Sequence, residues 1–192
     1  MIEIVPARPS HSYDIARLIV EAMTPECCNH LAGPHHSVED FLAVMQRLVE
    51  ADHSQYSFRN TSVALSNGQD VAGICVSYNG ADLHRLRSAF IAEAAQAFGM
   101  DYSHMSDETH PGELYLDSLA VDRAFRRQGI ARRLLADTVE KARRLNLPAV
   151  GLLVDQGNPD AERLYTSFGF RYINDAVWAG HPMKHLQFAV VP

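Results

Sequence analysis

Hydrophobic residues recur along this chain with two different spacings, which together predict alternating strands and helices. Short apolar runs typical of strands occupy 2–5, 61–65, 71–78, 114–121, 149–154, 170–173 and 186–191. Apolar residues three or four positions apart, typical of amphipathic helices, occupy 12–23, 37–50, 83–98, 129–145 and 159–168. The segment between the first two helices is rich in Cys, His, Gly and Pro, and we expect a loop there.

Local signals support several of these boundaries. Ser37 and Asp40 resemble a capping box at the start of a helix. The Asn67-Gly68 step tolerates positive φ and predicts a tight turn between two antiparallel strands. Asp82 directly precedes the helix predicted over 83–98, as an N-cap would, and Gly99 can close it.

The order of the elements predicts the fold class. A hairpin is followed by strand, helix, wholly apolar strand and helix, which implies one parallel pair joined by a crossover. We therefore expect an α/β fold whose mixed sheet is mostly antiparallel, with one parallel β-α-β crossover. A chain of 192 residues fits a single domain over 1–192, with a helical insertion at about 82–112. The insertion is a candidate for shaping a binding pocket or for a homodimer contact.

The composition limits the kinds of partner that we expect the protein to bind. The formal net charge of −6 at pH 7 disfavours nucleic acid, because a phosphate backbone needs a basic surface. No apolar run approaches membrane-spanning length, so we expect no membrane partner and a cytoplasmic location. Cys27, Cys28 and Cys75 cannot all pair, so we expect no disulfide framework.

The segment between the strand 114–121 and the next helix indicates an anion site. Arg126, Arg127, Arg132 and Arg133 surround a helix start that already carries the positive end of the helix dipole. An anion would relieve that repulsion, and Gly129 would allow the backbone to approach a diphosphate closely. The other interpretation is a solvated arginine-rich turn. A P-loop does not fit, because Lys and Ser/Thr do not follow the glycine.

This segment resembles motif A of the GNAT superfamily of acyl-CoA N-acyltransferases, Arg/Gln-x-x-Gly-x-Gly/Ala. Residues 126–131 satisfy it, and 158–170 resembles motif B, with Asn158, Tyr165 and Gly169-Phe170 at the expected spacings. The resemblance implies a GNAT-like fold and acetyl-CoA (coenzyme A) as cosubstrate. It implies cofactor contacts, mostly through backbone groups, from Leu119, Ala120, Val121, Arg127, Gln128, Gly129, Ile130, Ala131, Arg132 and Asn158.

The strand 114–121 offers independent support. Its apolar residues change phase near Asp117-Ser118, as a β-bulge requires, although a strand buried on both faces would explain the pattern nearly as well.

The resemblance also suggests residues for catalysis. Tyr165 resembles the general acid of the family, although from spacing alone it fits a packed core residue. Asp117 is our candidate for the base, with Glu113 and His110 in reserve; it could equally be structural. No metal is expected, because the Cys and His residues over 27–36 match no familiar zinc spacing.

The resulting hypothesis is an acetyltransferase for a primary amine of a small molecule or amino-acid-like acceptor, by direct attack in a ternary complex. Relatives that act on protein N-termini tend to have glutamate where this chain has Leu153, which weakens a protein-amine acceptor. A non-catalytic acyl-CoA-binding regulatory module stays open.

Overall fold

A seven-stranded sheet forms the centre of this computed structural model, which describes residues 1–190. Its strands are β1 (Ile2–Pro6), β2 (Thr61–Ser66), β3 (Asp70–Asn79), β4 (Leu114–Val121), β5 (Ala149–Asp155), β6 (Arg171–Trp178) and β7 (His181–Ala189). They lie in the order β1-β2-β3-β4-β5-β7-β6. Every neighbouring pair is antiparallel except β4 and β5, which are parallel. The predicted mixed sheet with one crossover is confirmed.

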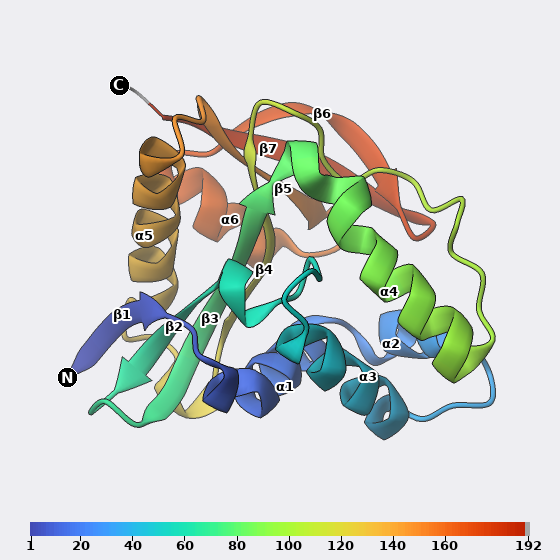
Figure 1. Ribbon diagram of the computed structural model, residues 1–192. Helices are drawn as coiled ribbons and strands as arrows, with labels where there is room; N and C mark the ends of the chain where they lie inside the picture. The colour runs from blue at the N-terminus through green and yellow to red at the C-terminus, as the bar shows by residue number, and fades with distance from the viewer. Residues whose placement is uncertain (191–192) are drawn as a thin grey trace.

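Helices pack on both faces of this sheet (Figure 1). Side chains on one face form a core with α1 (Ser12–Ala22), α2 (Pro25–Ala32), α3 (Val38–Glu50) and α4 (Leu83–Phe98). The other face packs mainly on α5 (Ile130–Arg144) and α6 (Pro159–Phe168). Strand alternation explains the two cores: on β3, Ile74 belongs to the first and Cys75 to the second. No helix within 1–190 combines the length and apolar character needed to cross a bilayer.

The capping and turn predictions hold with one exception. Ser37 and Asp40 form the reciprocal capping box at the start of α3. Asn67 and Gly68 adopt φ values of 51° and 76° in the turn between β2 and β3. The exception is Asp82, whose side chain does not cap α4, because the residue lies in a preceding 3-10 turn and its carboxylate bonds Arg85 instead.

The prediction of a loop after α1 is wrong, because most of that segment forms the helix α2. Thr24 caps this helix by accepting a hydrogen bond from the Cys27 amide at 3.2 Å, and Pro25 occupies its first position. A Thr-Pro-Glu start is a recognisable helix signal, but the Cys-Cys-Asn-His composition that follows obscured it. The helix matters because Cys27 lines the cavity described below.

The last two strands are longer than predicted. Both β6 and β7 extend toward their shared turn through polar residues, including Asn174, Asp175 and Lys184, which pair across the hairpin. Mostly exposed strands lack the apolar alternation on which the prediction depended. Residue 191, the predicted end of the last strand, lies outside the described residues.

Candidate active site

The two parallel strands separate soon after they meet. β4 and β5 pair only at Leu114 with Val150 and at Tyr115 with Gly151. Beyond that point β4 continues against β3 through Val121, while β5 continues against β7. A cavity of about 550 Å³ lies at the split, lined by residues from α1, α2, β4, β5, α6 and the β6–β7 hairpin.

A bulge in β4 directs polar groups toward this cavity. Val76 pairs with Ser118 and Ser77 pairs with Leu116, so Asp117 is an extra residue without a partner on β3. The predicted change of phase at Asp117-Ser118 is therefore confirmed as a β-bulge. Asp117, Ser118 and Leu119 all line the cavity.

Asp117 is electrostatically unusual. Its Oδ2 atom is shielded from solvent and has no hydrogen-bond partner within residues 1–190. Burial raises the pKa of Asp117 to about 7, although the positive charge of Arg87 acts in the opposite direction. A carboxylate with a pKa near neutrality can accept a proton efficiently and release it again.

The wall formed by α6 carries Asn158 and Tyr165. Asn158 caps the helix, because its Oδ1 accepts from the Ala161 amide at 3.1 Å, and Pro159 follows at the first position. Tyr165 lines the cavity and also packs its ring on Phe170 at 5.7 Å, so it is both a packing residue and a cavity residue. Burial raises the pKa of Tyr165, which keeps its hydroxyl protonated at neutral pH.

The start of α5 is open to solvent. Gly129 is its N-cap with φ 76°, and no side chain within residues 1–190 caps the helix. Arg127 also has positive φ, 65°, and residues 126–129 are exposed. The first amides of a helix have no acceptor within it, so the N–H groups of Ile130, Ala131 and Arg132 are available to a ligand. This matches the geometry predicted for a phosphate site.

The arginine part of that prediction needs correction. Arg126 donates to the Val121 carbonyl at 3.0 Å and lies 3.3 Å from a Glu21 carboxylate oxygen. Arg132 donates to Ser167, and Arg133 donates to the Ile2 carbonyl at 2.8 Å. Three of the four guanidinium groups therefore have protein partners, so the free helix amides, rather than repulsion between cations, indicate an anion site.

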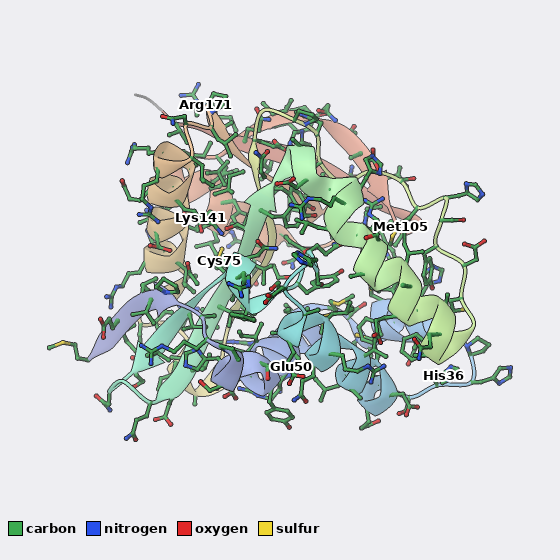
Figure 2. The ribbon with its side chains drawn as sticks, in the orientation of Figure 1. His36, Glu50, Cys75, Met105, Lys141 and Arg171 are labelled. Atoms are coloured by element: carbon green, nitrogen blue, oxygen red, sulfur yellow. The ribbon has the colours of Figure 1, made fainter. Side chains whose placement is uncertain are left out.

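The insertion contributes a buried ion pair that sequence reasoning missed. Glu108 lines the cavity and bonds Arg87 of α4, whose guanidinium also donates to the Met105 and Ser106 carbonyls at 3.0 Å. Figure 2 shows Met105 in the segment beside α4. Tyr78 donates to the same carboxylate at 3.1 Å. A lone arginine in a helix pattern gives no sign that it is buried, and Arg87 is only 3% exposed.

Substituting Arg87 should destabilise the protein strongly. Arg87→Met leaves the buried Glu108 carboxylate without its cation, and we expect a loss of about 3–5 kcal/mol in the free energy of unfolding. Arg85→Met is the matched control, because Arg85 lies on the same helix but forms an exposed pair with Asp82 worth roughly 1 kcal/mol or less. Urea unfolding of both variants measures the difference; equal losses would mean that Arg87 is not buried with Glu108.

The reserve residues Glu113 and His110 do not line the cavity. Glu113 is fully buried, where it accepts from Gln187 at 2.7 Å, lies 2.9 Å from His185 Nε2 and bonds Thr109 at 2.6 Å. These bonds outweigh burial and lower the pKa of Glu113. The cluster joins β4 to β7 where β4 and β5 still pair, so we interpret Glu113 as a structural group. Its ligand atoms and those of the two histidines lie within 4.8 Å of one another, a spacing that a metal ion could bridge, but the Glu113 hydrogen bonds are already satisfied.

The cysteines are free thiols. Burial raises the pKa of Cys27 and of Cys75 to about 11, so both are protonated at neutral pH. Cys75 lies between the sheet and α5, where it contacts the Thr138 hydroxyl at 3.1 Å (Figure 2).

The segment that forms this site matches a known protein family. Residues 34–170, well over half of the chain, match the model of the acetyltransferase (GNAT) family. The chain belongs to the GNAT family. The match includes β4, the bulge, the open start of α5 and α6, which carry the features described above.

Individual relatives agree with this membership. Acetyltransferase Atu2258 of Agrobacterium fabrum is 45% identical over 65 residues, which cover 34% of this chain and 46% of that protein, so the aligned region is less than half of that relative. A crystal structure described only as an acetyltransferase has a TM-score of 0.76 at 28% identity, covering 98% of this chain and 100% of the other.

Two further structures share the GNAT fold at lower identity. An N-acetyltransferase from Staphylococcus aureus Mu50 has a TM-score of 0.79 at 22% identity, covering 97% of this chain and 100% of the other. The structure of yncA from Salmonella typhimurium contains acetyl-CoA, with a TM-score of 0.57 at 16% identity over 100% and 95% of the chains.

Proposed function

We propose that this GNAT acetyltransferase moves the acetyl group of acetyl-CoA to the primary amine of a small molecule, by direct attack in a ternary complex. The observation that carries the proposal is the cavity at the β4–β5 split, which Asp117 and Tyr165 line from different elements. Acetyl-CoA bound to yncA, which shares this fold, supports the choice of cosubstrate.

The open start of α5 suits the pyrophosphate. The unpaired amides of Ile130, Ala131 and Arg132, together with that of Gly129, form a concentrated donor site for an anion. In this proposal residues 127–132 bind the pyrophosphate. The backbone of Leu119, Ala120 and Val121, on the edge of β4 that β5 no longer covers, binds the pantetheine arm and the thioester carbonyl. Asn158 uses its side-chain oxygen in the helix cap, so its side-chain Nδ2–H group can donate to that arm.

Asp117 and Tyr165 supply the proton transfers. Asp117 takes a proton from the substrate ammonium, and the neutral nitrogen attacks the thioester carbon. A C–N bond forms and the C–S bond breaks. Tyr165 donates its proton to the departing thiolate and regains one, through solvent, from the nitrogen of the product. The balanced result is one amide, one coenzyme A thiol and one proton.

Purified protein, acetyl-CoA and a panel of primary amines test this proposal. We expect release of the coenzyme A thiol that depends on the amine, together with an amine product heavier by one acetyl group in mass spectrometry. Binding of acetyl-CoA without transfer to any free amine or peptide would contradict the proposal and favour a regulatory acyl-CoA-binding module. Transfer to peptides alone would favour a protein-amine acceptor.

The pyrophosphate site has its own test. Gly129 and Gly68 both have φ 76°, and a Cβ at either position meets no atom of the described residues within 4 Å. Ala substitutions should therefore produce similar backbone strain, but only Gly129→Ala places a methyl group where the ligand approaches. Calorimetry should show about tenfold weaker acetyl-CoA binding for Gly129→Ala and an unchanged affinity for Gly68→Ala. Equal affinities in both variants would place the pyrophosphate elsewhere.

A further inference from the structure

Apart from the imidazole of His181, the acidic and basic side chains that line the cavity are carboxylates. Its lining includes the carboxylates of Glu26, Glu108, Asp117 and Asp155, and no lysine or arginine of residues 1–190 lines it. Arg87, behind the lining, neutralises Glu108. The nearest basic group to Asp155 is the exposed imidazole of His181, at 3.6 Å. Acidic groups around the cavity therefore outnumber basic ones.

One of these carboxylates has an oxygen atom without a hydrogen-bond donor in residues 1–190. The Oδ2 atom of Asp117 is shielded from water and has no donor within the described chain. A buried carboxylate oxygen without a hydrogen bond is unfavourable, and an ammonium group is the strongest donor that a small ligand can offer it. This observation is independent of the number of acidic residues nearby.

The uncharged part of the lining also suits a cation. Tyr56 and Tyr115 are both 5% exposed and contribute to the wall, and Trp178 at the end of β6 also lines the cavity. Aromatic rings attract cations through their electron-rich faces.

A carboxylate on the acceptor would find no lysine or arginine among the lining residues of the described chain. The nearby start of α2 is already capped by Thr24, and Glu26 lies in its first turn, so it does not attract an anion. The Trp178 indole N–H faces no partner in the described chain, but a single neutral donor does not balance a second negative charge. Amino acids with a free α-carboxylate are therefore poorly suited to this cavity.

Building on the proposed acetyl transfer, we infer that the acceptor is a small molecule with two cationic groups and no carboxylate, of the linear diamine type. One amine lies at Asp117, where it reacts. The second cationic group lies toward the exposed Glu26 on α2 and Asp155 at the end of β5. This narrows the proposed small-molecule acceptor and disfavours its amino-acid-like members.

Four matched compounds test the inference. L-Lysine is 1,5-diaminopentane with an added carboxylate. L-Lysinamide has a neutral amide in place of that carboxylate, and 1-aminopentane lacks the second cationic group. We expect kcat/KM for diaminopentane to exceed that for lysine by at least about tenfold, because like charges repel in a desolvated site. Lysinamide should recover most of this loss, and 1-aminopentane should be several-fold poorer than the diamine. Equal turnover of lysine and diaminopentane would overturn the inference.

A pair of variants locates the second charge. Glu26→Gln should raise the KM for diaminopentane about 2–5-fold, the range of an exposed ion pair, and leave 1-aminopentane unchanged. Glu39→Gln is the control, because Glu39 occupies the equivalent first turn of α3 and is exposed away from the cavity. A Glu26→Gln variant with unaltered preference for the diamine would contradict the placement.

Calorimetry in the presence of coenzyme A, which cannot transfer an acetyl group, separates this inference from the proposed function. Diaminopentane should bind this complex more tightly than lysine does. Such binding without any turnover would support the cation site while contradicting acetyl transfer. Turnover with lysine preferred over the diamine would support acetyl transfer while contradicting the cation site.

Discussion

Replacing Tyr165 with phenylalanine is expected to lower kcat by about 10²–10⁴-fold, the range for a positioned general acid. The substitution removes only a hydroxyl, and the ring can still pack on Phe170. Acetyl-CoA affinity and thermal stability should therefore change little. Initial rates of thiol release, measured beside calorimetric binding of acetyl-CoA, separate chemistry from binding.

Tyr172→Phe provides the control for this experiment. Tyr172 lies on the edge strand β6, is 54% exposed and does not line the cavity. We expect its loss of hydroxyl to leave kcat unchanged. If Tyr165→Phe turned over at the wild-type rate, protonation of the thiolate would have to come from solvent or from another residue.

Replacing Asp117 with asparagine should lower kcat/KM by about 10²–10⁴-fold, since an amide cannot take a proton from the ammonium. Because burial raises the pKa of Asp117 to about 7, the wild-type value should rise with pH and level off above about pH 7. The residual activity of Asp117→Asn should lack this ionisation. A variant that retains the wild-type pH profile would show that another group is the base.

The same variant should behave differently in unfolding experiments. The pKa of Asp117 is higher in the folded protein than its ordinary value of 3.8, so the unfolded chain releases this proton first as pH rises. Asp117 therefore lowers stability progressively between about pH 4 and pH 7. Asparagine resembles the protonated acid, so Asp117→Asn should be more thermally stable than wild type at pH 8, with a smaller difference at pH 5. A lower melting temperature at pH 8 would contradict a shielded Asp117 oxygen without a hydrogen-bond partner among the described residues.

The predictability of this fold from sequence varied with the kind of information each element carries. β5 and α5 were predictable because continuous apolar runs and helical spacing record burial directly. The bulge at Asp117 left a trace in the phase of its strand. α2 was missed because its apolar face is short, and the outer halves of β6 and β7 were missed because pairing to a neighbour, rather than burial, makes them strands.

The site was predictable where local backbone geometry sets the chemistry. The left-handed φ of Gly129 and the Asn158-Pro159 helix start both follow from residue type at a known spacing. Residues that act through distant contacts left no such trace. Arg87 and Glu108 are brought together by packing of the insertion, and Trp178 reaches the cavity only because the hairpin carries it there. The excess of acidic groups on the side of the cavity that would receive the acceptor could therefore be recognised only in the structure.

The proposed acetyl transfer requires acetyl-CoA to place its thioester at the β4–β5 split, between Asp117 and Tyr165. Nuclear Overhauser contacts from the methyl group of a bound, non-transferable acetyl-CoA thioether analogue measure this placement directly. We predict contacts to the Leu119 methyl groups and to the Tyr165 ring. The ring signals are assigned by their change in the Tyr165→Phe variant. If the methyl group of the analogue contacted neither residue when the protein was saturated with the analogue, the proposed placement of the thioester would be contradicted.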